Sequence, residues 1–207
     1  MSEVILVHGL WVPGAVMQPL AARLAGAGLR CRVFDYAGRA RPLEANVERL
    51  ARFARAAGPA HFVGHSLGGL VVLAALEAER SIEAGRVVLL GTPARGCFAG
   101  RRLARNAVGR WMLGETAPLW REGGAARWRR PEPLGVLAGT LPLGLGRALG
   151  PLPGPSDGVV CVEETAVEGM TERIVLPVSH SAMLVSARVA ASTASFLLHA
   201  RFPPHGR

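Results

Sequence analysis

The chain of 207 residues contains no lysine at all, so its 24 basic residues are all arginines. The arginines produce a formal net charge of +9, but they are spread over most segments and form no DNA- or RNA-binding motif. We interpret this charge as a compositional bias of the coding sequence and expect no nucleic-acid partner. Aspartate is scarce too, since it occurs only at Asp35 and Asp157.

The chain also has few cysteines and no long hydrophobic run. Cys31, Cys97 and Cys161 are odd in number and widely spaced, which excludes a disulfide framework and a cysteine-based metal site. No apolar run is long enough, and free enough of proline, glycine and arginine, to span a bilayer. The N-terminus runs directly into the apolar segment Val4–Val7 without a basic, cleavable leader, so we expect a cytoplasmic protein. Neither an H-E-x-x-H motif nor a phosphate-binding glycine loop occurs, and we expect no metal ion and no organic cofactor.

Apolar residues, in contrast, are plentiful. Half of the residues are hydrophobic and the mean hydropathy is +0.27, which is enough apolar material for one compact domain over residues 1–207. Six short runs are mostly continuous in apolar character and do not alternate, which is typical of parallel strands covered on both faces. They are Val4–Val7, Arg32–Phe34, Phe62–Val63, Val87–Leu90, Val136–Ala138 and Ile174–Val178.

Helical patterns lie between these runs and after the last one. They cover Val16–Leu24, Leu43–Ala54, Leu70–Leu76 and Met183–Ala200. The alternation predicts an α/β fold, a doubly wound, mostly parallel sheet of about six strands with helices on both faces. Ligands of such sheets bind beyond the carboxyl ends of the strands.

Two segments interrupt the alternation of strands and helices. Residues 97–133 hold three of the four tryptophans, Trp111, Trp120 and Trp128, and we expect this segment to be a helical lid inserted in the domain. Residues 141–156 form a tract of leucine, glycine and proline without periodicity.

Within the expected lid, five apolar residues fall on one helical face with arginines to one side. The apolar residues are Leu103, Ala104, Ala107, Val108 and Trp111, and the arginines are Arg101, Arg102 and Arg105. Such a helix either buries its apolar face over a pocket or makes peripheral contact with an anionic membrane surface.

The pentapeptide Gly64-His65-Ser66-Leu67-Gly68 has the pattern G-x-S-x-G and stands between an apolar strand and an apolar helix. In that context the pattern predicts a sharp strand-to-helix turn that exposes a serine hydroxyl above the sheet. Side chains at positions 64 and 68 would clash in such a turn, which accounts for the two glycines. The free N–H groups at the start of the helix favour a developing oxyanion on whatever binds the serine.

A serine becomes a strong nucleophile only when a base takes its proton and a third group orients the base. His180 follows the final strand and is therefore expected at the same edge of the sheet as Ser66. Asp157 lies in a turn between the last two strands. The order Ser66, Asp157, His180 thus brings a hydroxyl, a carboxylate and an imidazole to one edge.

Other titratable residues are alternatives to this set. Asp35 also ends a strand and is the main rival acid, although we expect it to cap a turn, and Glu163 and Glu164 are lesser rivals. His65 is expected to point away from the neighbouring serine, and His8 is expected to shape a loop. The other histidines, expected at the amino-terminal edge of the sheet or in solvent, are His61, His199 and His205.

An oxyanion hole requires two backbone donors. One is expected to be the N–H of Leu67, directly after the serine. The other is expected in the loop after the first strand, where Gly9 lets the backbone come close. Leu10 is the expected donor there, with Trp11 as the alternative.

Residues Val4–Gly9, Gly64–Gly69, Asp157-Gly158 and His180 together resemble the α/β-hydrolase superfamily. The short format is similar to that of small bacterial lipases and esterases. The resemblance implies Ser66 as nucleophile, His180 as base and Asp157 as acid, with acyl-enzyme chemistry on a carboxylic ester. The chain departs from the family pattern in one respect, because the tract at 141–156 separates the acid from its strand.

We therefore expect a serine ester hydrolase of the lipase or esterase kind that acts on a small-molecule acyl ester, in one interpretation a lipid-like one. An acyltransferase or a thioesterase would use the same three residues, and the sequence does not separate these activities. A binding protein that keeps the fold without turnover is a third interpretation, against which the complete set of three residues argues.

Overall fold

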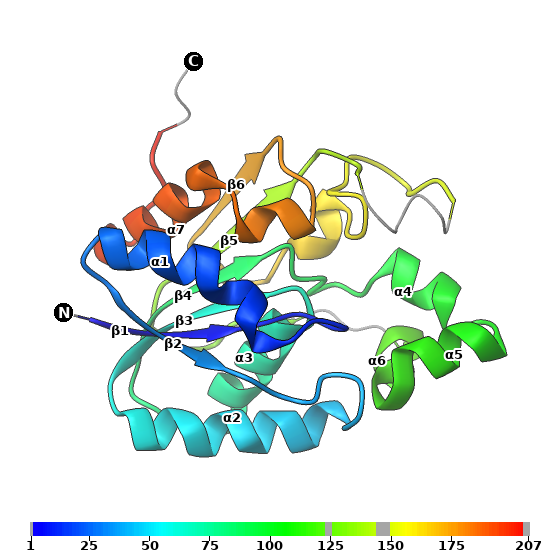
Figure 1. Ribbon diagram of the computed structural model, residues 1–207, viewed down its shortest axis with the longest axis horizontal. Coiled ribbons are helices and arrows are strands. Elements are labelled where there is room, and N and C mark those ends of the chain that lie inside the picture. Colours follow the sequence, from blue (N-terminus) through cyan, green and yellow to red (C-terminus); the bar gives the residue numbers. More distant parts are fainter. Residues whose placement is uncertain (1, 123–125, 144–149, 205–207) are drawn as a thin grey trace.

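The computed structural model describes residues 2–122, 126–143 and 150–204 of the chain (Figure 1). Its centre is a parallel sheet of six strands in the order β2-β1-β3-β4-β5-β6. The strands are β1 (Glu3–Val7), β2 (Arg30–Phe34), β3 (Ala60–His65), β4 (Ala84–Leu90), β5 (Leu134–Gly139) and β6 (Glu172–Leu176). The predicted fold class is confirmed.

The apolar runs of the sequence form strands, because helices cover both faces of the sheet. Val4, Ile5, Leu6 and Val7 of β1 alternate between the two faces, and all four side chains are fully buried. The last strand is shorter than the sequence predicts, since β6 ends at Leu176 instead of Val178. Pro177 has no N–H for the ladder, and the Val178 N–H turns back to the Leu176 carbonyl oxygen at 2.8 Å.

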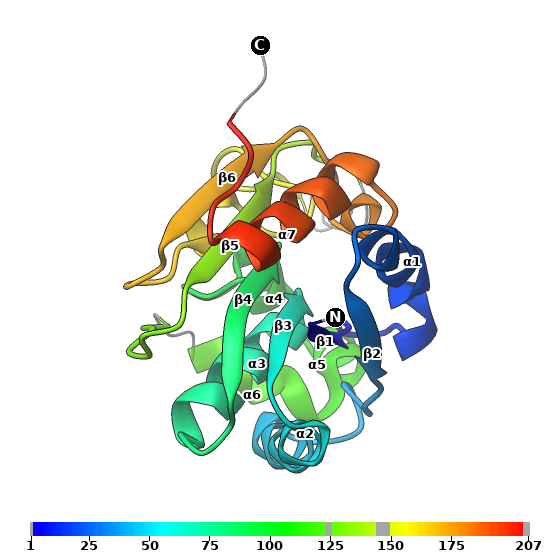
Figure 2. The ribbon, with the colours of Figure 1, turned by 90° about the vertical axis from the view of Figure 1, so that its left-hand side faces the viewer.

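Two long helices cover each face of the sheet (Figure 2). On one face lie α1 (Gln18–Gly26) and α7 (Ala187–His199). A short 3-10 turn, η1 (Gly14–Met17), comes directly before α1. On the other face lie α2 (Leu43–Ala57) and α3 (Leu67–Ala78). α3 is apolar on almost every side because α2, the sheet and the segment after β4 surround it.

The C-terminal helical region is divided where the sequence predicts one helix from Met183 to Ala200. A 3-10 turn, η5 (Ser181–Leu184), comes first, and α7 begins after Ser186. The Ser186 hydroxyl accepts the N–H of Val189 at 3.3 Å, which is an N-cap that starts a new helix.

Where the structure describes it, the segment between β4 and β5 contains three short helices and a 3-10 turn. They are α4 (Phe98–Leu103), α5 (Ala107–Leu113), η2 (Gly114–Thr116) and α6 (Ala117–Glu122). The predicted single helical face from Leu103 to Trp111 is wrong. The chain leaves the helix after Leu103, and Asn106 starts α5 by accepting the N–H of Gly109 at 2.7 Å. As a result Leu103 is buried, whereas Val108 and Trp111 are 68% and 70% exposed.

The long connection from β5 to β6 carries the 3-10 turn η4 (Val162–Thr165). Part of the leucine, glycine and proline tract, residues 144–149, lies outside the described residues. Within the described ranges, no helix has both the length and the apolar character needed to cross a bilayer.

The order in which strands join the sheet changes sides at β1, since β2 lies on one side of β1 and β3 on the other. The carboxyl ends of β1 and β3 therefore form a topological switch point, the place where ligands of such sheets bind. Gly9 and Ser66 both lie there, because Gly9 comes just after β1 and Ser66 just after β3.

Candidate active site

Ser66 occupies a strained turn between β3 and α3. Its φ of 55° and ψ of −124° lie in a region that non-glycine residues rarely adopt, which costs on the order of 1–3 kcal/mol. A Cβ at Gly64 would lie 2.5 Å from the Gly69 Cα, and one at Gly68 would lie 2.3 Å from the Val7 carbonyl oxygen. Only glycine therefore fits two residues before and two residues after the serine. The Ser66 side chain is half-buried.

Asp157 and His180 form a buried pair at the same edge of the sheet. The His180 Nδ1 lies 2.7 Å from Oδ2 of Asp157, and the Asp157 side chain is almost completely buried. Oδ1 accepts the N–H groups of Val159 and Val160 at 2.9 and 2.8 Å. Since a carboxylate only accepts, we assign the hydrogen to Nδ1, which leaves Nε2 of His180 free to accept a proton.

Asp157 returns to its strand despite the tract at 141–156. A Cβ at Gly139, the last residue of β5, would lie 2.8 Å from the Cβ of Asp157. Asp157 therefore lies beside the carboxyl end of β5, although the tract separates the two in the sequence.

Asp157 and His180 lie beside Gly91, the residue after β4, and the backbone of Ser66 is hydrogen-bonded to the residue before Gly91. The Ser66 N–H donates to the Leu90 carbonyl oxygen at 2.9 Å. A Cβ at Gly91 would lie 2.9 Å from Asp157 Oδ2 and 3.1 Å from His180 Nδ1. In the part of the chain that the structure describes, the Ser66 hydroxyl has no hydrogen-bond partner; such bonds commonly tighten only when a substrate is bound.

The loop after β1 lies against the serine. A Cβ at Gly9 would be 3.1 Å from the Ser66 Cβ, so a side chain there would press on the nucleophile position. His8 shapes this loop, since its Nδ1 lies 2.8 Å from the Gly9 carbonyl oxygen and its Nε2 accepts the Tyr36 N–H at 3.2 Å. The Tyr36 hydroxyl donates to the His8 carbonyl oxygen at 2.9 Å. Burial lowers the pKa of His8, and the Asp35 carboxylate, whose Oδ1 lies 3.1 Å from His8 Nε2, acts in the opposite direction without reversing the shift. The lowered pKa favours the neutral ring that accepts the Tyr36 N–H.

The two expected oxyanion donors belong to the two segments that meet at Ser66, the start of α3 and the loop after β1. Leu67 is the first residue of α3, and Leu10 follows Gly9 in the loop. Trp11, the alternative donor, has a φ of 64° and donates its indole N–H to the Met112 carbonyl oxygen at 2.7 Å. The loop is thus attached to α5 at a strained residue.

Two of the rival residues, Asp35 and His61, have other partners. The Asp35 carboxylate is 72% exposed, and its Oδ1 accepts the Gly14 N–H at 2.6 Å, which holds the loop before η1. Nδ1 of His61 accepts the Arg86 N–H at 2.8 Å, near the amino-terminal end of β4. The other rivals lie in α7 (His199), in η4 (Glu163 and Glu164) and outside the described residues (His205).

The three tryptophans of the expected lid differ in position. Trp111 is exposed on α5, with the Arg39 guanidinium 4.8 Å from the centre of one of its rings. Trp120 is buried and donates to the Thr116 hydroxyl at 3.1 Å. Trp128 donates its indole N–H to the Glu132 carbonyl oxygen at 2.7 Å, directly before β5. That contact places Trp128 at the amino-terminal edge of the sheet, away from Ser66.

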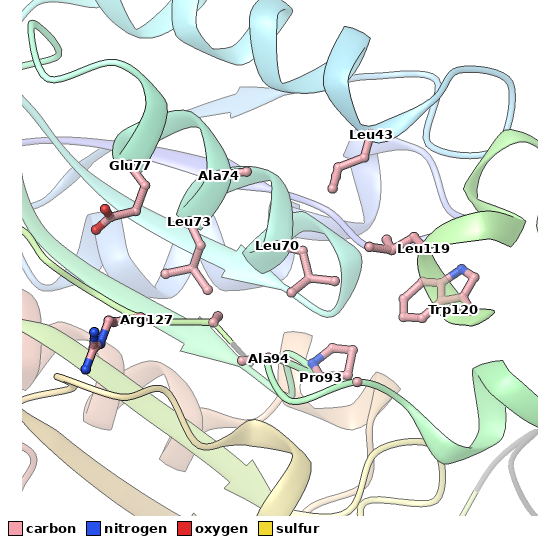
Figure 3. A pocket seen from close by; sticks show the side chains of 12 residues that line it. Leu43, Leu70, Leu73, Ala74, Glu77, Pro93, Ala94, Leu119, Trp120 and Arg127 are labelled. Carbon is pink, nitrogen blue, oxygen red and sulfur yellow. The ribbon is translucent and has the colours of Figure 1, made fainter. Parts of the chain in front are cut away.

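An apolar groove of about 310 Å³ runs beside α3 (Figure 3). Leu43, Leu70, Leu119 and Trp120 gather at one end, and Glu77 and Arg127 lie at the other. Leu73, Ala74, Pro93, Ala94, Gly96 and Ala126 complete the lining. Leu70 is one helical turn from Ser66, roughly 6 Å along the axis, so the apolar end of the groove is near the strained turn.

No group of three or more histidine, cysteine, aspartate or glutamate side chains within the described ranges is arranged to hold a metal ion.

The sequence does not predict one feature of the site, the contact between His65 and His180. Their ring centres lie 4.7 Å apart. No sequence signal marks this contact, because the two residues are 115 positions apart.

The sequence profile of the Alpha/beta hydrolase family matches residues 4–203, which is nearly the whole chain. No match was found among curated protein sequences. Among solved structures, the chain resembles the mature form of the lipase BlEst2 of Bacillus licheniformis, with a TM-score of 0.76 and 16% identity. That alignment covers 97% of this chain and 92% of the other.

Two further structures show how widely this fold is used. One is a lipase-esterase related protein of Clostridium acetobutylicum, with a TM-score of 0.62, 16% identity and 94% of each chain covered. The other is a bromoperoxidase of Bacillus anthracis, with a TM-score of 0.67, 11% identity, and 95% of this chain and 91% of that one covered. Identities this low establish a shared fold and leave the reaction to be argued from the site.

Proposed function

The chain belongs to the Alpha/beta hydrolase family, and we propose that it is a serine hydrolase that cleaves carboxylic esters. The observation that supports this proposal best is the 2.7 Å contact between Asp157 and His180 beside the strained turn of Ser66. A hydroxyl, an imidazole with a free Nε2 and a buried carboxylate then stand in the order that acyl transfer to serine requires.

In the proposed first step, the Ser66 Oγ attacks the acyl carbonyl carbon while His180 Nε2 takes the hydroxyl proton. The bond from the acyl carbon to the alcohol oxygen then breaks, and the imidazolium returns its proton to the leaving alcohol. In the second step, water attacks the acyl-enzyme and gives its proton to Nε2. The acid leaves, and the proton returns to Ser66.

Asp157 has two tasks in this scheme. Its Oδ2 keeps the hydrogen on Nδ1 and so keeps Nε2 free, and its charge stabilises the imidazolium that forms. The N–H groups of Val159 and Val160 hold Oδ1 in place, so the carboxylate is oriented before the substrate arrives.

The N–H groups of Leu67 and Leu10, with Trp11 as the alternative to Leu10, are the proposed donors to the oxyanion. Gly9 supports this assignment because its backbone lies directly against Ser66. Loss of one such donor typically lowers the rate by about a hundred- to a thousandfold.

We place the acyl group of the substrate in the groove beside α3. The groove starts about one helical turn from Ser66, and its lining is apolar apart from Glu77 and Arg127 at the far end. An ester with an apolar acyl chain matches this lining, since each buried methylene contributes about 0.8 kcal/mol.

The first experiment is labelling with a fluorophosphonate, which reacts only with an activated serine. We expect the wild-type protein and Ser81→Ala to be labelled and Ser66→Ala to stay unlabelled; Ser81 is exposed at the end of α3 and serves as the control. If the wild-type protein were not labelled, the interpretation as a binding protein on this fold would be favoured. Product analysis with p-nitrophenyl esters, with and without an added alcohol or a thioester substrate, then separates hydrolase, acyltransferase and thioesterase.

A further inference from the structure

His65 is the last residue of β3, and the proposed reaction does not use it. Like Val63 two residues earlier, its side chain faces the side of the sheet that α1 and α7 cover. Only 4% of its surface is exposed. Its ring centre lies 4.7 Å from that of His180, at an angle of 44° between the ring planes.

The polar contact of His65 is with the backbone of His180. Nε2 lies 3.1 Å from the His180 carbonyl oxygen. A carbonyl oxygen only accepts, so Nε2 carries the hydrogen and Nδ1 is bare. Nδ1 has no hydrogen-bond partner in the described part of the chain, and a Cβ at Gly9 would lie 3.1 Å from it.

The ring of His65 stays neutral at the pH of any ordinary assay. Burial lowers the pKa of His65 to about 3, and the neighbouring His180 and His8 act in the same direction. The hydrogen bond to the His180 backbone and the charge of Asp157 act in the opposite direction without reversing the shift. The Nε2–H donor is thus present whether His180 is neutral or protonated.

Three hydrogen bonds hold His180 in place. Its N–H donates to the Asp157 carbonyl oxygen at 2.9 Å, and its Nδ1 contacts the Asp157 carboxylate at 2.7 Å. These two bonds tie His180 to the loop of the acid. The third bond comes from His65, which directly precedes Ser66, and so it ties His180 to the strained turn. Among the described residues, this third bond is the one hydrogen bond between the strained turn and the loop of His180.

We propose that His65 is a positioning residue whose Nε2–H holds the His180 carbonyl and thereby sets the distance from the His180 imidazole to the Ser66 hydroxyl. This inference rests on the proposed function and adds a residue to it. His65 is buried below the site and does not touch the substrate, so its loss lowers kcat and leaves KM unchanged. A displacement of about 1 Å between reacting groups can lower a rate by roughly a hundredfold.

Two substitutions separate the hydrogen bond from the packing of the ring. His65→Gln places an amide N–H about where Nε2 lies but has no ring, whereas His65→Phe keeps the ring and has no donor. We expect His65→Gln to keep most of kcat and His65→Phe to lose roughly a hundredfold at unchanged KM for a p-nitrophenyl ester. Thermal unfolding of each variant checks that the protein is folded.

A variant with a shorter amide, His65→Asn, serves as the second comparison if His65→Phe does not fold. It has the same chemistry as His65→Gln but does not reach the carbonyl, so we expect a loss of kcat like that of His65→Phe. Equal kcat for Gln and Asn, or a higher kcat for Phe than for Gln, would overturn the inference while fluorophosphonate labelling of Ser66 upholds the proposed function. A wild-type protein without labelling would overturn both.

Discussion

Asp157 holds His180 at two points, through its carboxylate at 2.7 Å and through its backbone carbonyl oxygen at 2.9 Å. The second bond fixes the backbone of the histidine, and the first fixes the tautomer and the plane of its ring. Both groups are buried, so water competes little for either bond. The pair is therefore already arranged for the proposed chemistry in the absence of a substrate.

The first prediction concerns this pair. Asp157→Asn removes the charge that stabilises the imidazolium and no longer imposes the tautomer, so we expect kcat for a p-nitrophenyl ester to fall by about 10³- to 10⁴-fold. Asp35→Asn is the control, because its exposed side chain still accepts the Gly14 N–H and keeps a polar group beside His8, whose Nε2 lies 3.1 Å from Asp35 Oδ1. If Asp35→Asn lost activity and Asp157→Asn kept it, the assignment of the acid would be reversed.

A second prediction tests the steric demand of the turn. Gly68→Ala would bring a Cβ within 2.3 Å of the Val7 and His8 carbonyl oxygens, which are backbone atoms that cannot move aside. We expect a loss of several kcal/mol in the free energy of unfolding, or no folded protein, because overpacking against backbone is severe. Gly26→Ala in α1 meets nothing within 4 Å, and we expect it to raise stability by roughly 0.5–1 kcal/mol. Urea unfolding measures both, and equal stability of the two variants would contradict the prediction.

The third prediction concerns Arg130, which closes the end of α3. Its guanidinium is buried, donates to the Leu76 and Ile82 carbonyl oxygens at 2.8 and 2.9 Å, and pairs with Glu132 at 2.7 Å. We expect Arg130→Met to lower the free energy of unfolding by about 3 kcal/mol, because carbonyl groups and a carboxylate lose their partner.

The control for Arg130 is an exposed ion pair near the same helix end. Arg55 contacts Glu79 at 2.7 Å, but both side chains are well exposed. We expect Arg55→Met to change the free energy of unfolding by less than about 1 kcal/mol in the same urea titration. A similar loss in the free energy of unfolding for both variants would show that burial of the arginine does not determine how much its contacts stabilise the protein.

The fourth prediction tests the groove as the acyl site. Ala74 lines it two helical turns from Ser66, roughly 12 Å along the axis. We expect Ala74→Phe to shorten the groove and to lower kcat/KM for long-chain p-nitrophenyl esters by about 10- to 100-fold, with little change for the acetate. Ala78→Phe is the control, because Ala78 is exposed one helical turn beyond Ala74 and does not line the groove. An equal effect on all chain lengths would place the acyl group elsewhere.

For the fifth prediction, we propose that the carboxyl edge of the sheet contacts an anionic membrane surface. Seven of the eight exposed large apolar side chains in the described part of the chain lie on this edge. They are Trp11, Val108, Trp111, Met112, Leu141, Leu143 and Val185, and the eighth, Leu198, is on α7. The exposed Arg105 and Arg110 add positive charge beside α5. Arg102 is half-buried and donates to the Pro151 carbonyl oxygen, so it contributes less than the sequence suggested.

Vesicles that contain anionic lipid test this contact by co-sedimentation. We expect the double variant Val108→Ser, Trp111→Ser to bind several-fold more weakly than the wild-type protein, and Leu198→Ser to bind as the wild type does. Binding that does not change in the double variant would remove the proposal and favour a different role for α5.

Prediction from the sequence worked best where the signal is local. The strands were recognisable because both faces of the sheet are buried, which makes every residue of a strand such as Val4–Val7 apolar. The helical segment after β4 differs from the prediction, because burial of Leu103 and capping by Asn106 divide the predicted amphipathic face between two short helices. Asn106 is a preferred N-cap residue, so it is the local signal in the sequence that marks this division.

By itself the sequence determined the alternation of strands and helices and the strained turn at Ser66, because apolar runs, glycines and turn residues act within a few positions. Only the tertiary structure decided that Asp157 returns to the end of β5, that Trp128 lies at the opposite edge, and that His65 holds the carbonyl of His180. Each of these depends on contacts between residues far apart in the chain. Such contacts arise when the whole sheet assembles, and no local pattern encodes them.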